Sequence, residues 1–88
     1  MDLVDGMRVF VASVETGSFS GAAARLGMSP KLASKYMAEL EAQLGTQLLH
    51  RTTRRLGLTA AGEQLLSRAP DWLNELDEMT GELREARR

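Results

Sequence analysis

Glycines and helix-capping residues divide the first half of the chain into three short segments. Within each segment the apolar residues recur every three or four positions, as they do on one face of a helix. Each segment follows a residue whose side chain can cap a helix N-terminus, and these residues are Asp2, Ser18 and Ser29. Each segment also ends at a residue suited to stopping a helix, and these residues are Gly17, Gly27 and Gly45. The sequence therefore predicts three short helices, with a sharp corner between the first two.

The third segment opens with the pair Ser29-Pro30. Proline suits the first turn of a helix, because its missing N–H is not needed there and its fixed φ matches the helix. We therefore expect Pro30 to start this helix rather than to break it. The inward row that fits helical spacing best is Ala33, Met37, Leu40 and Leu44. The residues that then face outward near the N-terminal end are Lys31, Ser34, Lys35 and Tyr36.

The spacing of apolar residues changes after Gly45. Two short runs, LLHR and RLGL, predict a small β-hairpin with its tip near Thr53. Strands this short are not stable alone, so we expect them to pack on the helices. The basic residues Arg51, Arg54 and Arg55 lie in or beside this hairpin.

A final long helix is predicted over residues 60–87, with Thr59 as its N-cap. Pro70 disfavours helical geometry at Ala69, so we expect a kink or a break at this pair. The helix carries an apolar stripe wider than one small domain can cover, which favours pairing with a second copy of the chain. The residues expected at this dimer contact are Leu65, Leu66, Ala69, Trp72, Leu73, Leu76, Met79 and Leu83.

Composition excludes several classes of protein. The chain has 88 residues, no cysteine and a single histidine, His50, so neither a disulfide framework nor a clustered metal site is expected. It lacks a nucleophile–base pair and a glycine-rich phosphate loop, so we expect no enzyme activity and no cofactor. No apolar run is long enough to span a membrane, and the N-terminus MDLVDGMRVF is acidic rather than signal-like. These features predict a soluble, cytoplasmic protein.

Positive charge gathers in the middle of the chain. The net charge is −1 overall, but it is +3 over residues 28–59 against −1 before and −3 after them. A local basic patch can bind phosphates even when the whole chain is acidic. Three short helices, a hairpin and a Ser-Pro helix after a sharp corner describe a mainly α winged helix-turn-helix. In such a fold the third helix enters the major groove and the hairpin reaches phosphate or the minor groove. The basic residues lie on these two elements, which predicts double-stranded DNA as the partner.

Several segments spread over nearly the whole chain form a specific combination: Phe10, GSFSGAAARLGMS (17–29), Ala33-Ser34-Lys35, LEAQLGTQLLHRTTRR (40–55) and LTAAG (58–62). The combination resembles the N-terminal DNA-binding domain of LysR-type transcriptional regulators. The resemblance implies a winged helix-turn-helix over residues 1–59 and a dimerising linker helix over residues 60–88. It also implies a C-terminal effector domain, absent from this chain, that binds a small-molecule co-inducer. The implied function is sequence-specific regulation of transcription by a homodimer on a partly palindromic operator.

The residues expected to contact DNA are Ser18, Pro30, Lys31, Ser34, Lys35, Tyr36, Arg51, Thr53, Arg54 and Arg55. Two of them depart from the family pattern, which often has Gln at the position of Pro30 and Arg at that of Lys35. Lysine lacks the bidentate fork of arginine, so its base specificity should be softer. Pro30 can offer a base only an apolar contact. Arg51 has an alternative role, which is to hold the hairpin to the helices through an acid such as Glu41.

The competing interpretation is a winged-helix protein-interaction module without DNA specificity of its own. Its docking surface would be the apolar stripe of the final helix. Retention of DNA at two salt concentrations separates the two interpretations, because phosphate contacts weaken steeply with salt.

Overall fold

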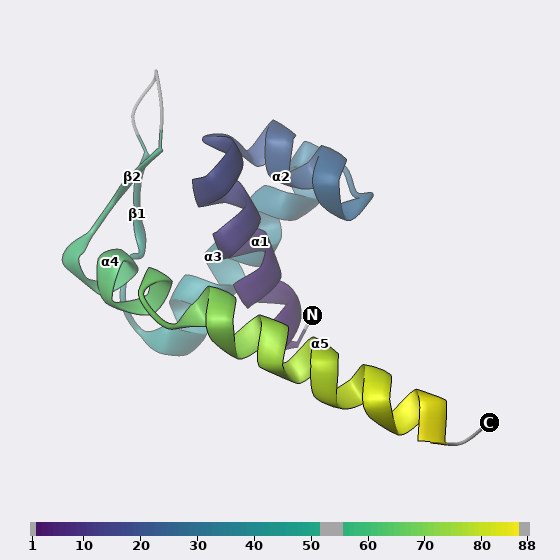
Figure 1. Cartoon of the computed structure of the whole chain (residues 1–88). Coiled ribbons are helices and arrows are strands. Elements are labelled where there is room, and N and C mark those ends of the chain that lie inside the picture. Colours follow the sequence, from purple (N-terminus) through teal and green to yellow (C-terminus); the bar gives the residue numbers. More distant parts are fainter. Residues whose placement is uncertain (1, 52–55, 87–88) are drawn as a thin grey trace.

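Three helices form the body of the molecule. The computed structural model describes residues 2–51 and 56–86. Its first helices are α1 (Leu3–Thr16), α2 (Phe19–Leu26) and α3 (Pro30–Leu44), and each packs on the other two (Figure 1). They have the bounds expected from the capping pattern, and Pro30 is the first residue of α3, as predicted.

The predicted caps of these helices are confirmed. The polar residue before each helix accepts a hydrogen bond from the backbone N–H three residues on, at 2.9 Å for Asp2 and Ser18 and at 3.1 Å for Ser29. Each helix ends at a glycine in the left-handed conformation, and these are Gly17, Gly27 and Gly45, with φ of 82°, 70° and 71°. Short-range hydrogen bonds thus set where each helix starts and stops.

The sharp corner between α1 and α2 brings the backbone at Gly21 close to the side chain of Thr16. A Cβ atom at Gly21 would lie 2.6 Å from both Cβ and Oγ1 of Thr16. The Thr16 hydroxyl itself donates to the carbonyl of Ala12 at 2.7 Å, which holds it against the end of α1. Glycine at position 21 therefore lets the start of α2 fold back onto α1.

The core lies between the three helices and the start of the hairpin. Its largest fully buried side chains include Val9, Phe10, Met37, Leu40, Leu48 and Leu49. Three of the four residues predicted to face inward on α3 are fully buried, but the prediction for Leu44 is wrong, because this side chain is 40% exposed. The last turn of α3 runs on past the core, and Glu41 takes the buried position beside the hairpin.

The hairpin stands to one side of the three helices (Figure 1). It pairs β1 (Leu49–Arg51) with β2 (Leu56–Leu58) in antiparallel register, with Leu49 opposite Leu58. The tip predicted near Thr53 lies outside the described residues. The mainly α fold with a small hairpin that the sequence predicted is confirmed.

A short helix, α4 (Ala60–Leu66), closes the base of the hairpin. The hydroxyl of its N-cap, Thr59, accepts a hydrogen bond from the N–H of Gly62 at 3.0 Å. The Thr59 N–H donates to the carbonyl of Leu48 at 3.1 Å. A Cβ at Gly62 would lie 2.1 Å from that same carbonyl oxygen. The first turn of α4 thus rests directly on the backbone at the start of the hairpin, and only glycine fits at the contact.

The last helix, α5 (Ala69–Ala86), is separate from α4. The sequence predicted one helix over residues 60–87 with a kink or a break near Ala69-Pro70, and the structure has a turn at Ser67 and Arg68 between the two helices. Pro70 is the second residue of α5, where its missing N–H costs no helical hydrogen bond. The first half of α5 crosses α1, and its second half extends away from the body (Figure 1). None of the described helices combines the length and the apolar character needed to cross a membrane.

Candidate nucleic-acid interface

The N-terminal half of α3 presents a basic surface. Pro30, Lys31 and Lys35 are exposed, while Ser34 is half-buried between them. Residues three and four positions apart share one face of a helix, which puts Lys31, Ser34 and Lys35 side by side. Within residues 2–51 and 56–86, neither lysine forms an ion pair. Both ammonium groups can therefore meet an anionic partner.

Other cations of the body are already paired. Arg25 forms an ion pair with Glu15, and Arg8 makes a bidentate pair with Asp77 of α5, at 2.7 and 3.1 Å. The hydrogen bond and the charge of Arg8 hold the pKa of Asp77 below its usual value. The lysines of α3 thus differ from these two arginines, whose charge is met by a carboxylate of the same chain.

Two of the predicted DNA contacts have structural roles of their own. The Ser18 hydroxyl is half-buried and caps α2 through the N–H of Gly21. Tyr36, predicted to face outward, is half-buried and packs against the core cluster. This contact shields part of the aromatic ring and leaves the rest exposed to solvent, so the outward orientation predicted for Tyr36 holds only in part.

The hairpin is attached to α3 by Glu41 and Arg51. The Glu41 carboxylate is 8% exposed and accepts hydrogen bonds from the N–H groups of Leu48 and Leu49 and from the Arg51 guanidinium. Burial opposes ionisation of Glu41, but the hydrogen bonds from Leu48 and Arg51 outweigh it and lower the pKa of Glu41. Arg51 thus takes the alternative role considered for it, as a link between hairpin and helices. The predicted contacts Thr53, Arg54 and Arg55 lie outside the described residues.

The apolar stripe of α4 and α5 divides into inner and outer parts. Ala69 and Leu73 are 3% and 6% exposed and belong to the core of their own chain, so their predicted place in a dimer contact is wrong. The break at Ser67 and Arg68 turns this side of α5 onto α1. The half-buried members of the stripe are Leu65, Leu66 and Leu76. The exposed members are Trp72, Met79 and Leu83, at 48%, 49% and 61%.

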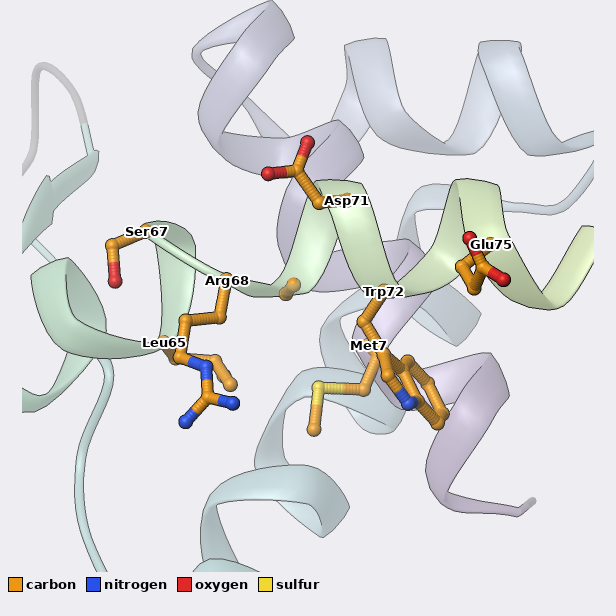
Figure 2. A pocket seen from close by; sticks show the side chains of 8 residues that line it. Met7, Leu65, Ser67, Arg68, Asp71, Trp72 and Glu75 are labelled. Atoms are coloured by element: carbon orange, nitrogen blue, oxygen red, sulfur yellow. The ribbon is translucent and has the colours of Figure 1, made fainter.

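An open groove of about 610 Å³ lies at the joint between α4 and α5. Figure 2 shows the side chains of Leu65, Arg68 and Trp72 directed into this region together with Met7 of α1. The groove continues the exposed face of α5 onto the body. Exposed apolar surface of this kind is typical of interaction sites. No group of three or more potential metal ligands occurs in the part of the chain that the structure describes.

Sequence reasoning missed the link between Arg8 and Asp77. The two residues are 69 positions apart, and each looks like an ordinary solvated charge in its own helix. The burial of Glu41 was also not evident, although Glu41 was named as an acid that could pair with Arg51. A charged residue within the apolar LEAQL segment, ten positions before an arginine, was the only local signal.

Residues 4–63 match the family model for bacterial regulatory helix-turn-helix proteins of the lysR family. The HTH-type transcriptional activator AllS of Salmonella typhi is 49% identical over 79 residues, which are 90% of this chain and 26% of that protein. The HTH-type transcriptional regulator PtxR of Pseudomonas aeruginosa is 49% identical over 76 residues, 86% of this chain and 24% of that one. The chain thus spans about a quarter of the length of these relatives.

Solved structures of similar sequence share the whole fold. The CbnR_DBD–DNA complex superposes with a TM-score of 0.85 at 35% identity and covers 100% of both chains. The BenM_DBD complex with catB site 1 DNA gives a TM-score of 0.86 at 34% identity, over 98% of this chain and 96% of that one. Both similar proteins were crystallised with DNA.

Proposed function

Because the chain belongs to the lysR family of bacterial regulatory helix-turn-helix proteins, we propose that it binds double-stranded DNA sequence-specifically and regulates transcription. The observation that carries the proposal is the pair of exposed lysines, Lys31 and Lys35, on the N-terminal half of α3. This is the part of the third helix that a winged helix-turn-helix places against base edges. The CbnR and BenM domains, which share the fold of this chain, form complexes with DNA, and this likeness supports DNA binding by this chain.

In the proposed complex, α3 lies in the major groove with Lys35 and Ser34 next to base edges. Lys31 is close enough to the helix start to meet a phosphate, and Pro30 offers an apolar contact to a thymine methyl group. The N-terminus of α2, capped by Ser18, directs backbone N–H groups toward the phosphate chain. Thr53, Arg54 and Arg55 are proposed to reach phosphate or the minor groove.

We propose further that residues 60–88 join two copies into a homodimer. The exposed residues Trp72, Met79 and Leu83 share one face of α5, since their spacings of seven and four keep them within a narrow sector. A two-fold pair would place two α3 helices on half-sites about one DNA turn apart, or a multiple of it. Replacing Leu83 with Glu should shift the chain from dimer to monomer in sedimentation without unfolding it, because this side chain is 61% exposed in the single chain.

The proposal is tested by selecting duplexes that the chain retains from a random pool. A partly palindromic consensus is the expected result, and its half-site spacing would report the dimer geometry. Retention should also fall steeply between two salt concentrations, because binding releases counterions from the DNA and this release is less favourable when the surrounding salt is more concentrated. An unenriched pool, or no retention at low salt, would contradict the proposal and favour a protein-interaction module.

The proposed role is binding without chemistry of its own, in the cytoplasm where bacterial DNA is accessible. The two lysines that carry the proposal are exposed ammonium groups. Their chemistry suits recognition of an anion rather than turnover.

A further inference from the structure

A buried carboxylate on α3 is fully engaged by the strand that begins the wing, which is the hairpin of β1 and β2. Glu41 Oε2 accepts from the N–H of Leu48 at 2.7 Å and from that of Leu49 at 3.2 Å. Glu41 Oε1 accepts from Arg51 Nη2 at 2.7 Å. Three donors from one short segment of backbone and side chain thus converge on a single anion, which fixes the position of β1 on α3.

Arg51 extends this contact to a second helix. Its guanidinium carbon lies 5.8 Å from the centroid of the Phe19 ring, at the start of α2. A guanidinium over an aromatic face is attracted by the ring while its edge remains free to bind a carboxylate. Arg51 therefore joins the wing to α2 and α3 at once.

The positive charge of Arg51 is already paired with a carboxylate of the same chain, that of Glu41. A DNA phosphate that approached the guanidinium would come close to the Glu41 carboxylate, and two anions at such a distance repel one another. The side chain is only partly exposed, at 38%. These conditions differ from those of Lys31 and Lys35, which are exposed without an ion-pair partner in residues 2–51 and 56–86.

We infer that Glu41 and Arg51 are positioning residues, which form a clamp that holds the wing at a set place relative to α3. On this inference Arg51 supports DNA binding by placing the wing and does not itself contact phosphate. The consequence for DNA rests on the proposed function, but the clamp itself does not.

Replacing Glu41 with Gln gives a test in which two physical effects have opposite sign. If Glu41 affected DNA only through its negative charge, removing that charge would strengthen the electrostatic attraction of DNA. Loss of the clamp weakens binding, because the wing no longer meets the DNA backbone in register. We expect E41Q to bind the selected duplex about tenfold more weakly, the size of one charged hydrogen bond. The control E78Q removes an exposed acid from α5 and should not weaken binding.

A double-mutant cycle separates the clamp from a direct contact. If Arg51 acts through Glu41, R51Q and E41Q lose the same contribution and the double variant binds no more weakly than the weaker single variant. The salt dependence of binding should then fall in both single variants, because a displaced wing makes fewer phosphate contacts. The opposite result is that the losses of binding free energy in R51Q and E41Q add up in the double variant. If, in addition, the slope of log K against log salt concentration falls by about 0.9 in R51Q and is unchanged in E41Q, Arg51 contacts phosphate directly and the inference is overturned.

Hydrogen exchange tests the clamp without DNA. The amides of Leu48 and Leu49 should exchange faster in E41Q than in the wild-type chain, whereas E78Q should leave them unchanged.

If E41Q does not fold, R51K serves instead, because lysine keeps the charge that a phosphate needs but lacks the planar fork. The clamp predicts weaker DNA binding and faster exchange at residues 48–49 in R51K, and unchanged values of both would overturn it.

The two proposals can fail separately. Absence of wild-type binding to any duplex at low salt would refute the proposed function alone, and the exchange rates at residues 48–49 would still decide the clamp. Normal wild-type binding together with unaltered exchange in E41Q would refute the clamp and leave the proposed function standing.

Discussion

Replacing Gly62 with alanine should destabilise the chain, although alanine is the better helix former. A Cβ at this position would lie 2.1 Å from the carbonyl oxygen of Leu48 and 3.1 Å from Cδ2 of Leu58. The nearer atom belongs to the backbone and cannot rotate away. The first turn of α4 must therefore move off the hairpin, which also breaks the hydrogen bond from the Thr59 N–H to Leu48.

The expected loss combines three contributions. Overpacking of a tight contact costs about 1–3 kcal/mol, and the broken hydrogen bond adds about 1 kcal/mol. The higher helix propensity of alanine offsets about 1 kcal/mol of this. The free energy of unfolding should therefore fall by about 2 kcal/mol, which in a domain of this size lowers Tm by about 8–16 °C.

Thermal and urea unfolding at a fixed protein concentration measure this change, and Gly81 provides the matched control. Gly81 is also a helical glycine, but a Cβ there meets nothing within 4 Å. G81A should raise the free energy of unfolding by up to about 1 kcal/mol, the ordinary gain from glycine to alanine in a helix. If G62A and G81A changed stability by the same amount, the reasoning from backbone contact would be refuted.

Three further outcomes are expected. S13A should keep or raise the unfolding free energy by up to about 1 kcal/mol, because the buried Ser13 hydroxyl has no hydrogen-bond partner in the described residues; a clear decrease in urea unfolding would contradict this. The pKa of Glu41 is lowered by folding, so its contribution to stability is present above its unfolded pKa, near 4.5, and disappears as pH falls through the folded value; E41Q should flatten this part of the stability–pH curve. K35A should lose about 1–3 kcal/mol of discrimination between selected and random duplexes in competition binding, and equal losses on both would exclude a role in base recognition.

The parts of the fold that depend on near neighbours in the chain were predictable from the sequence. Ser18 and Gly27 determine a helix because a cap requires only residues three or four positions away. Pro30 could be placed at a helix start for the same reason. Such signals are complete within a short window, so no knowledge of the tertiary fold was needed to interpret them.

The orientation of α5 was not predictable in this way. Trp72 and Leu73 are adjacent and both strongly apolar, yet one is 48% exposed and the other 6%. Spacing alone shows that a helix has a broad apolar face but not which edge meets its own body. The break before Ala69-Pro70 could be predicted from Pro70, but the direction that α5 takes after it also depends on the long-range pair of Arg8 with Asp77, which no local pattern encodes.

Helix α5 is attached to α1 near one end and is free at the other, so a small rotation at the attachment moves the free end by a larger distance. Leu73 and the pair of Asp77 with Arg8 hold its first half, while the second half, to Ala86, extends away from the body (Figure 1). At about 1.5 Å per residue, the part of α5 from Leu73 to Ala86 is about 20 Å long, so a tilt of about 10° at Leu73 moves the far end by about 3.5 Å. Weakening the ion pair of Arg8 with Asp77 should therefore displace the far end of α5 more than its attached end. A force applied near Ala86 would in turn act on α1 and, because α1 packs on α3, on α3 as well.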